Sequence, residues 1–407
     1  MSTPSKPTLG IGMVGYSFMG RAHSQAWRNA RSYFDAPLEP RLTTVSGRNE
    51  AAAAETAHRF GWDSVETDWR RLLDRDDIDV IDICTPGDTH AEIAIAALQA
   101  GKHVLCEKPL ANSVAEAESM VEAADTARAR GIQSMVGFTY RRVPAIAHAR
   151  RLVEEGRLGR ILHVRGHYLQ DWLTDPASPL TWRLQKERAG SGALGDIGAH
   201  IVDLAQFVTG EQLMGVAART ETFVRERPVS GTSSVNSLGG TAAANDAEHL
   251  GAVTVDDAAI FVSQLTGGAL AIFEATRFAT GRKNAIRLEI NGTRGSVAFD
   301  FEDMNVLHVY DADAPARDAG FTRVLVTEEA HPYVAAWWPP GHVLGYEHSF
   351  THQAVDFLTA LAEGTAPRPG FADGLQVQRV LSAVETSAER SGSWTSIADA
   401  PARAVVS

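Results

Sequence analysis

Two side chains that could exchange a proton with a substrate stand four residues apart near the middle of the chain. Asp196 and His200 lie in AGSGALGDIGAHIVDLAQF, residues 189–207, at the start of an apolar periodic run. On a helix, this spacing puts a carboxylate and an imidazole on one face. The carboxylate can orient the ring and favour its protonated form, which suits a proton acceptor near neutral pH. The structural alternative makes Asp196 a helix N-cap and His200 a packing residue.

A lysine that could stabilise negative charge follows an apolar run upstream, in LCEKPLANS, residues 105–113. Pro109 biases Lys108 away from helical geometry and limits the direction of its side chain. At the carboxyl end of a central strand, such a lysine could polarise a substrate hydroxyl and stabilise the alkoxide that forms on hydride loss. The alternative is a lysine that ends a strand in water.

The elements that must position these groups begin with a strand, a glycine turn and a helix. LGIGMVG from Leu9 is apolar, and YSFMGRAHSQAWRNA after it has helical periodicity. This is the context of a dinucleotide-binding turn, in which Gly15 makes the turn and Gly20 lets the helix pack closely on the strand. Ser17 replaces the middle glycine. Its Cβ limits the approach of the phosphates, although its hydroxyl could donate a hydrogen bond.

The pattern then alternates, which predicts a parallel sheet with helices on both faces. The expected strands are 41–47, 62–65, 80–84, 103–106 and 132–138, and the expected helices are 50–60, 67–74, 89–100 and 114–130. The fold class is therefore α/β, a doubly wound Rossmann domain over residues 1–140. Ligands of such sheets lie at the carboxyl ends of the strands, which brings together the loops at residues 15–20, 47–48 and 85–90.

The end of the second strand bears on the choice of cofactor. NAD-selective sites commonly have an acidic residue here, whereas a nearby arginine accommodates the 2′-phosphate of NADP. Gly47 takes the place of the acid, and Arg48 follows it. These two residues favour NADP, and the alternative is a surface turn with a solvated arginine.

Four motifs together resemble the Gfo/Idh/MocA family of NAD(P)-dependent sugar and polyol oxidoreductases: GYSFMGRAH, TPGDTHAEIA, EKPLA and GALGDIGAH. The resemblance covers nearly the whole chain. It implies a catalytic group of Lys108, Asp196 and His200. It also implies a cofactor site for NAD or NADP made of Gly15, Ser17, Phe18, Met19, Gly20, Gly47, Arg48, Thr85, Pro86, His90, Glu107 and Lys108. LQDWLTDPASPLTWR, EATR and AHPY are most similar to the levoglucosan dehydrogenase branch, which implies NAD and oxidation of the 3-hydroxyl of an anhydro sugar.

A second domain, α+β with a large open and mostly antiparallel sheet, is expected over residues 141–407. A helix at 141–156 and a strand at 160–169 lead into QDWLTDPASPLTWR, where aromatic rings stand beside amides, carboxylates and a guanidinium. This mixture suits a pyranose, which has C–H faces to stack and hydroxyls to pair. The predicted substrate-binding residues are Tyr140, Gln170, Asp171, Trp172, Trp182, Arg183, Asp196, His200 and His331.

The rest of this domain is predicted from alternation and composition. Alternating runs from Val255 to Tyr310 indicate antiparallel strands with helices on one face, so the other face needs a cover. The family's habit of pairing sheets between subunits implies a homodimer or homotetramer. Residues 228–253, poor in large apolar side chains, are expected to form a long mobile loop. The tail from His331 to His342, with Trp337 and Trp338, is expected to close the site, and helices are expected at 351–362 and 374–390.

Composition narrows the class of protein. The 407 residues carry a formal net charge of −12, without a basic run interleaved with aromatics, which argues against nucleic acid as a partner. MSTPSKPTLG lacks an apolar signal core, and no apolar run is long enough to span a bilayer. Cys84 and Cys106 are expected to be reduced core residues of a cytoplasmic protein. We predict no metal site, because the histidines are scattered.

Together these patterns predict hydride transfer from a secondary alcohol of a neutral cyclic sugar to NAD(P), giving a keto sugar. Levoglucosan or a glucoside is the expected substrate and C3 the expected position. Inositol or polyol dehydrogenase is an alternative. A glycoside-cleaving enzyme that uses NAD transiently and a non-catalytic regulator of the same fold also remain open, although retention of Lys108, Asp196 and His200 argues against the regulator.

Overall fold

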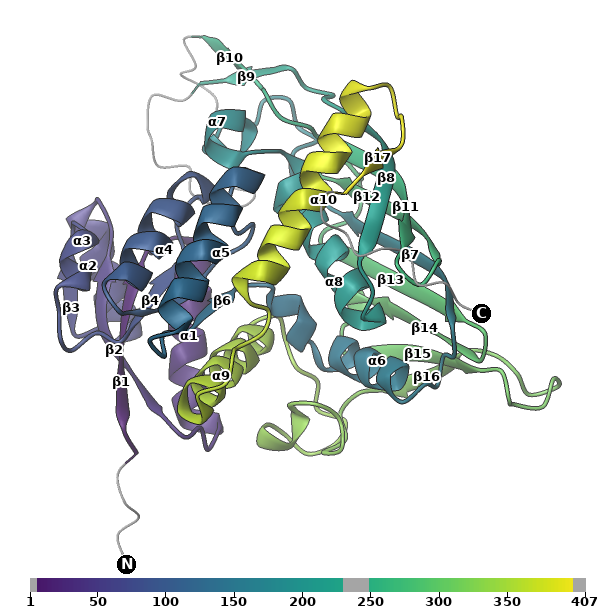
Figure 1. Cartoon of the computed structure of the whole chain (residues 1–407), viewed down its shortest axis with the longest axis horizontal. Helices are drawn as coiled ribbons and strands as arrows, with labels where there is room; N and C mark the ends of the chain where they lie inside the picture. Colours follow the sequence, from purple (N-terminus) through teal and green to yellow (C-terminus); the bar gives the residue numbers. More distant parts are fainter. Residues whose placement is uncertain (1–5, 230–248, 398–407) are drawn as a thin grey trace, which may run out of the picture. The chain divides into compact units, whose positions relative to one another are not determined.

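The computed structural model describes residues 6–229 and 249–397 (Figure 1). The chain forms two compact units, one of Met1–Thr139 with Gly345–Leu375 and the other of Tyr140–Leu344 with Gln376–Ser407. The predicted division, 1–140 and 141–407, differs because a late segment returns to the first unit. Its helix α9, His348–Glu363, places Phe350 and Phe357 in the core of that unit.

The first unit is built on a six-stranded parallel sheet in the order β3-β2-β1-β4-β5-β6. Its strands are β1 Thr8–Val14, β2 Glu39–Ser46, β3 Ser64–Glu66, β4 Val80–Ile83, β5 His103–Cys106 and β6 Ser134–Val136. Its helices are α1 Phe18–Tyr33, α2 Glu50–Phe60, α3 Arg70–Leu73, α4 His90–Gln99, α5 Val114–Arg128 and α9.

This strand order confirms the doubly wound Rossmann domain. The central strands are apolar because both faces are covered, and every residue of β4 is buried. The chain direction across the sheet reverses between β1 and β4, so loops at their carboxyl ends flank the switch point where such folds bind ligands. The predicted loops 15–20 and 85–90 follow these two strands.

The second unit contains a nine-stranded sheet in the order β16-β15-β14-β13-β7-β12-β11-β8-β17. Only the β7–β12 pair is parallel within this sheet, which confirms a mostly antiparallel second sheet. The strands are β7 Ile161–Leu169, β8 Leu213–Glu221, β11 Ala258–Leu265, β12 Leu270–Thr276, β13 Ala285–Gly292, β14 Gly295–Asp300, β15 Val306–Asp311, β16 Thr322–Leu325 and β17 Thr395–Ser396.

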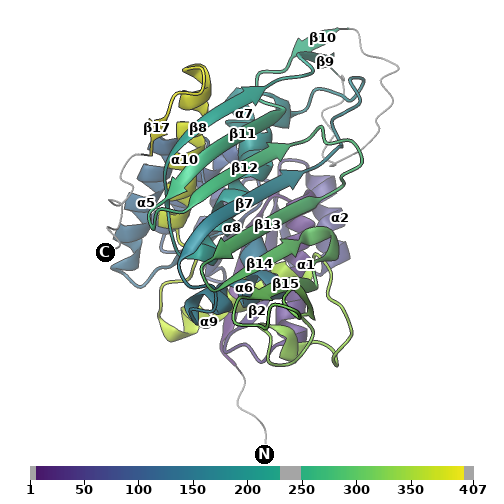
Figure 2. The same cartoon turned by 90° about the vertical axis from the view of Figure 1, so that its right-hand side faces the viewer.

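Helices cover one face of this sheet. They include α6 Pro144–Glu154, α8 Ala199–Thr209 and most of α10 Phe371–Glu389. The short helix α7, Lys186–Ala189, precedes α8 in the sequence. In Figure 2, the strands from β8 to β15 face the viewer, and α6 and α8 lie behind them. Burial alternates along β11, so one set of its side chains points to the helices and the other set points outward.

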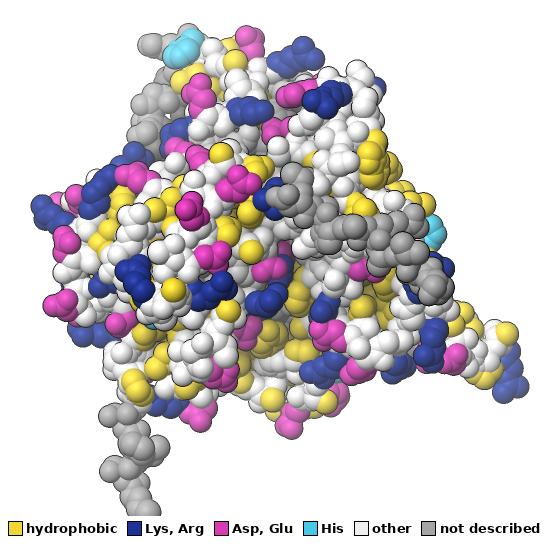
Figure 3. All heavy atoms as spheres, in the orientation of Figure 1, with side chains coloured by type: hydrophobic (Ala, Val, Ile, Leu, Met, Phe, Trp, Pro, Cys, Tyr) yellow, Lys and Arg dark blue, Asp and Glu magenta, His cyan; other side chains and the backbone are white. Residues whose placement is uncertain are grey.

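The predicted loop at 228–253 has ordered ends. β9, Glu226–Pro228, pairs antiparallel with β10, Leu250–Ala252, and residues 230–248 between them lie outside the described part. Cys84 and Cys106 are buried and free of disulfides. Among the described helices, none is long and apolar enough to cross a membrane. Acidic and basic side chains are interspersed on the face shown in Figure 3.

Candidate active site

The glycine turn after β1 has the geometry that a dinucleotide needs. Gly15 has φ 103°, and a Cβ there would lie 2.7 Å from the Cys84 carbonyl oxygen. A Cβ on Gly20 would lie 2.2 Å from the Gly15 carbonyl oxygen, so the helix can pack this close only with glycine. Ser17 is the N-cap of α1 but makes no side-chain cap bond, and the first turn of this helix has no acidic residue. The helix N-terminus therefore suits a pyrophosphate.

The end of β2 explains why a glycine replaces the expected acid. A Cβ on Gly47 would lie 1.9 Å from the ring of Tyr16, so any side chain here would displace that ring. Arg48 is exposed next to it. The side chain of Asn49 caps α2 by accepting a hydrogen bond from the Ala52 amide, at 3.1 Å. The role of Arg48 toward a 2′-phosphate stays a prediction.

The ends of β4 and β5 are tied together by a buried histidine. His90 Nδ1 lies 2.9 Å from the Pro109 carbonyl oxygen, and its Nε2 lies 2.9 Å from the Thr85 carbonyl oxygen. The predicted cofactor residue His90 therefore joins the predicted loop 85–90 to Pro109, the residue after Lys108. Lys108 itself is half-buried.

In the second unit, Asp196 and His200 lie on an irregular helix. Leu194–Gly198 is a π-helical turn that runs directly into α8. The Asp256 carboxylate accepts hydrogen bonds from the amides of Gly192 and Leu194, at 2.7 and 2.8 Å. Asp196 is therefore inside the turn and is not its N-cap, so the structural alternative for this residue was wrong. π-helical turns are rare and frequently occur at functional sites.

His200 is the first member of a continuous set of contacts, which we call the polar ring. The ring of His200 packs on Tyr140 with centroids 4.6 Å apart. The Tyr140 hydroxyl lies 3.0 Å from that of Tyr168, which donates a hydrogen bond to Asn284 Oδ1 at 2.7 Å. Nearby, a bidentate ion pair between Arg141 and Asp203 on α8 fixes the segment that carries Tyr140.

The polar ring continues through the predicted substrate loop back to Asp196. Gln170 Nε2 donates to the same Asn284 oxygen at 2.7 Å, and Trp172 Nε1 donates to Gln170 Oε1 at 2.8 Å. The Trp172 ring lies 5.7 Å from the guanidinium carbon of Arg277. Arg277 Nη1 lies 3.5 Å from Asp196 Oδ2, so the set that starts at His200 ends at Asp196. The structure thus brings five predicted substrate residues of this unit together.

Two arginines at the polar ring, Arg277 and Arg183, make contacts within the protein. Arg277 is fully buried, and its Nη2 donates to the Asp256 carbonyl oxygen at 3.1 Å. The guanidinium of Arg183 stacks on Trp182 at 4.4 Å. Burial lowers the pKa of Arg183, while the charge of Asp196 acts in the opposite direction. Trp182 and Arg183, both predicted substrate residues, therefore form a stacked pair close enough to Asp196 for its charge to act on Arg183.

Two predicted substrate residues have other contacts. Asp171 Oδ2 accepts hydrogen bonds from Lys283 Nζ at 2.7 Å and from the Gly281 amide at 3.0 Å, and the bond to Lys283 lowers the pKa of Asp171. His331 packs on His148 with ring centroids 5.0 Å apart, and burial lowers the pKa of both histidines. Their substrate contacts, and closure of the site by the tail, stay predictions.

Sequence reasoning missed three members of the polar ring. Tyr168 stands two residues before Gln170 and shares its side of the extended chain, so alternation could have identified it. The sequence indicates Arg277 only as the last residue of the EATR motif. Asn284 precedes β13 and reaches the ring only through tertiary contacts, so no local pattern indicates it.

The sheet order and the glycine turn define the class of protein: a dinucleotide-binding α/β protein with a second, sheet-based domain. Family models match both units, an "Oxidoreductase family, NAD-binding Rossmann fold" over residues 9–138 and a "GFO/IDH/MocA C-terminal domain" over residues 146–298. The chain belongs to the Gfo/Idh/MocA family and is an NAD-binding oxidoreductase.

Similar proteins align with nearly the whole chain. A levoglucosan dehydrogenase of Pseudarthrobacter phenanthrenivorans is 44% identical over 391 residues, 96% of this chain and 98% of that protein. The crystal structure of an oxidoreductase domain protein from Kribbella flavida is 62% identical with a TM-score of 0.91, covering 97% of this chain and all of the other. A levoglucosan dehydrogenase in complex with NADH and levoglucosan is 42% identical with a TM-score of 0.88, covering 96% and 100%.

Proposed function

We propose that this protein oxidises the C3 hydroxyl of a neutral cyclic sugar, with levoglucosan as the first candidate, and transfers the hydride to NAD. The observation that carries the proposal is the polar ring, which links Asp196 and His200 to aromatic and amide side chains. The 44% identity with a levoglucosan dehydrogenase along nearly the whole chain supports the choice of sugar.

A neutral substrate is favoured because two cations near the ring, Arg277 and Lys283, already face carboxylates. Arg277 is buried and faces Asp196, and Lys283 is bonded to Asp171. A phosphate or carboxylate on the sugar would need a free cation of matching geometry. Neutral hydroxyls can instead pair with amide and phenol groups such as those of Gln170 and Tyr140.

The residues divide the chemical work in the way that the family motifs imply. His200 accepts the hydroxyl proton, and Asp196 orients its ring. Lys108, which the EKP motif assigns to the catalytic group, stabilises the negative charge that develops on the substrate oxygen. The bound nicotinamide supplies the hydride acceptor. The Tyr140 ring, packed edge-on against His200, limits the movement of the imidazole.

A screen of nicotinamide reduction tests this function. Levoglucosan, glucosides, free hexoses, inositols, glucose 6-phosphate and a glucuronate are each incubated with NAD, and the carbonyl position of the product is assigned by NMR. We expect activity on neutral sugars and a 3-keto product. Activity confined to phosphorylated or acidic sugars would contradict the substrate class, and a C1 carbonyl would contradict the position of oxidation. Sugar cleavage without net NADH would favour the glycoside-cleaving alternative.

We also propose that the outer face of the second sheet pairs with a second copy of the chain. Ile260, Val262, Leu270 and Ile272 on β11 and β12 are 46–56% exposed and lie on one face. A contiguous apolar surface of this kind is typical of an interface. Light scattering is expected to show a dimer or tetramer, and Ile272→Asp is expected to shift it toward monomer. A wild-type monomer at micromolar concentration would contradict this proposal.

A further inference from the structure

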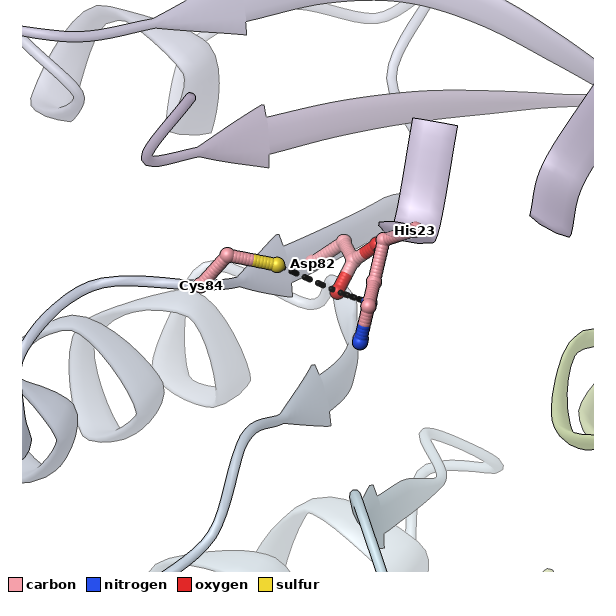
Figure 4. Close-up of side chains that lie close together, drawn as sticks. All are labelled: His23, Asp82 and Cys84. Carbon is pink, nitrogen blue, oxygen red and sulfur yellow. Dashed lines mark hydrogen bonds and ion pairs between the residues drawn. The ribbon is translucent and has the colours of Figure 1, made fainter. Parts of the chain in front are cut away.

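A chain of charged side chains crosses the core of the first unit. His23 Nδ1 on α1 lies 2.9 and 3.0 Å from the two carboxylate oxygens of Asp82 on β4. On its other side, His23 Nε2 lies 3.0 Å from Glu107 Oε1. The three residues are only 2%, 0% and 3% exposed. Figure 4 shows the Asp82 carboxylate between the His23 ring and the Cys84 thiol.

This arrangement is a hydrogen-bonded ion network, although ligand-type atoms of His23, Asp82 and Cys84 lie within 4.8 Å of one another. A metal ion with bonds of about 2 Å would have to separate His23 from the Asp82 oxygens that it already contacts. Trp27 Nε1 also donates to Asp82 Oδ2 at 2.7 Å. Burial raises the pKa of the Cys84 thiol to about 12, so the thiol is protonated at neutral pH. The described residues therefore satisfy this cluster by themselves.

The network ends at the backbone of Lys108. Glu107 Oε2 accepts a hydrogen bond from the Lys108 amide at 3.3 Å. A Cβ on Gly137 would lie only 2.6 Å from Glu107 Oε1, so the carboxylate is packed against backbone at a residue where only glycine leaves room. Both oxygens of Glu107 thus have partners within the first unit.

The residue after Lys108 is held as well. The Pro109 carbonyl oxygen contacts buried His90, which also contacts the Thr85 carbonyl oxygen at the end of β4. Lys108 is therefore flanked on both sides by positions that a buried histidine fixes. An exposed loop that only joined two elements would not need two such anchors.

We propose that the buried chain Asp82–His23–Glu107 positions Lys108, and that Glu107 acts through Lys108 and does not contact the dinucleotide. This inference rests on the proposed function, because it takes Lys108 as the group that stabilises charge on the substrate oxygen. Glu107 and His23 are positioning residues in this scheme. A displacement of about 1 Å at a catalytic group can lower turnover by about 100-fold, so such an anchor affects the rate strongly.

Two substitutions disturb the anchor by different means. Glu107→Gln keeps the shape, but an amide cannot accept from both His23 Nε2–H and the Lys108 amide, because one of its two ends is a donor. Gly137→Ala keeps every charge and pushes on the carboxylate. Trp62→Phe is the matched control, since it removes a buried hydrogen bond to Ser24 in the core of the same unit, at 3.0 Å, and Trp62 is not a member of the Asp82–His23–Glu107 chain.

The experiment measures turnover at saturating sugar and NAD, the dissociation constant of NAD by fluorescence, and the melting temperature. For Glu107→Gln and Gly137→Ala we expect kcat to fall by about ten- to 100-fold while the NAD dissociation constant stays within about threefold. Trp62→Phe is expected to lower the melting temperature to a similar extent and to keep kcat within about twofold of wild type. Crystal structures of both anchor variants with NAD are expected to show Lys108 displaced.

Three results would overturn the proposal. The first is a loss of kcat in the anchor variants no larger than in Trp62→Phe, and the second is Lys108 unmoved in their crystals. The third is weakened NAD binding by Glu107→Gln with turnover retained at saturating NAD, which would make Glu107 a dinucleotide contact. A wild-type protein that reduces NAD with none of the sugars would instead refute the proposed function, and the displacement of Lys108 in the crystals would still decide the positioning role.

Discussion

The side chain of Asn284 is the point at which two parts of the polar ring meet, and its removal tests whether that ring organises the site. Its Oδ1 accepts hydrogen bonds from Tyr168 and from Gln170, both at 2.7 Å. Asn284→Ala leaves both donors without this acceptor. A buried donor left unsatisfied costs about 1–3 kcal/mol.

The structure places the expected cost at the lower end of that range. The Tyr168 hydroxyl is buried but can turn toward the Tyr140 hydroxyl, 3.0 Å away, and half-buried Gln170 can turn toward water. We therefore expect a loss of about 1–2 kcal/mol in the free energy of unfolding. The rearranged Tyr140 and Gln170 should lower kcat/KM for the sugar by about tenfold or more, which corresponds to about 1.4 kcal/mol.

Steady-state kinetics and urea unfolding measure the two effects separately. Asn305→Ala is a matched control, because Asn305 also makes two hydrogen bonds, to the backbone of Leu344, both at 2.9 Å. It should cost similar stability and leave kcat/KM unchanged. If Asn284→Ala keeps wild-type kcat/KM, or if Asn305→Ala lowers it equally, the polar ring does not organise the site.

Three further predictions concern catalysis, cofactor choice and pH. His200→Ala and Lys108→Ala should each lower kcat by about 100-fold or more with NAD binding near normal, and near-wild-type turnover in either folded variant would refute its role. NAD should bind and NADP should also be accepted, because Gly47 places no carboxylate near a 2′-phosphate while Arg48 is exposed beside it; fluorescence titrations that detect NAD but not NADP would refute the role of Arg48. Burial alone would lower the pKa of His23, but the Asp82 carboxylate raises this pKa well above the ordinary value of 6.5. The interaction of protonated His23 with Asp82 therefore stabilises the fold fully below about pH 6.5, and this stabilisation is lost as the pH rises through the pKa of His23 in the folded protein. The free energy of unfolding should therefore fall toward alkaline pH more steeply in wild type than in His23→Gln, and equal slopes in urea unfolding would contradict this.

The first unit was predictable because its elements carry strong local signals. β5 and α2 have the predicted bounds, 103–106 and 50–60, since an apolar run and a capped helix with a following glycine mark them locally. Helix α3 is shorter than predicted, Arg70–Leu73 instead of 67–74. The return of α9 to this unit depends on Phe350 and Phe357 reaching a distant core, which no local pattern shows.

The candidate site was predictable where residue types and their spacing are distinctive. It was not predictable where tertiary contacts determine which residues belong to the site. Asp196 and His200 have a recognisable spacing, but the π-helical turn depends on Asp256, which lies far along the chain from it. Asn284 and Arg277 become informative only once folding brings them to Gln170 and Asp196. Polar partners of this kind are brought together only by the fold, so single-sequence patterns do not indicate them.

The most direct test of the central claim follows the transferred hydrogen. Levoglucosan carrying deuterium at C3 is incubated with the protein and NAD, and the reduced nicotinamide and the sugar product are analysed by mass spectrometry and NMR. We predict one deuterium per molecule of NADH formed, a 3-keto sugar, and a turnover rate on the deuterated sugar no faster than on the unlabelled one. NADH without deuterium, or deuterium retained in the sugar product, would show that the hydride does not come from C3 and would contradict the proposed function.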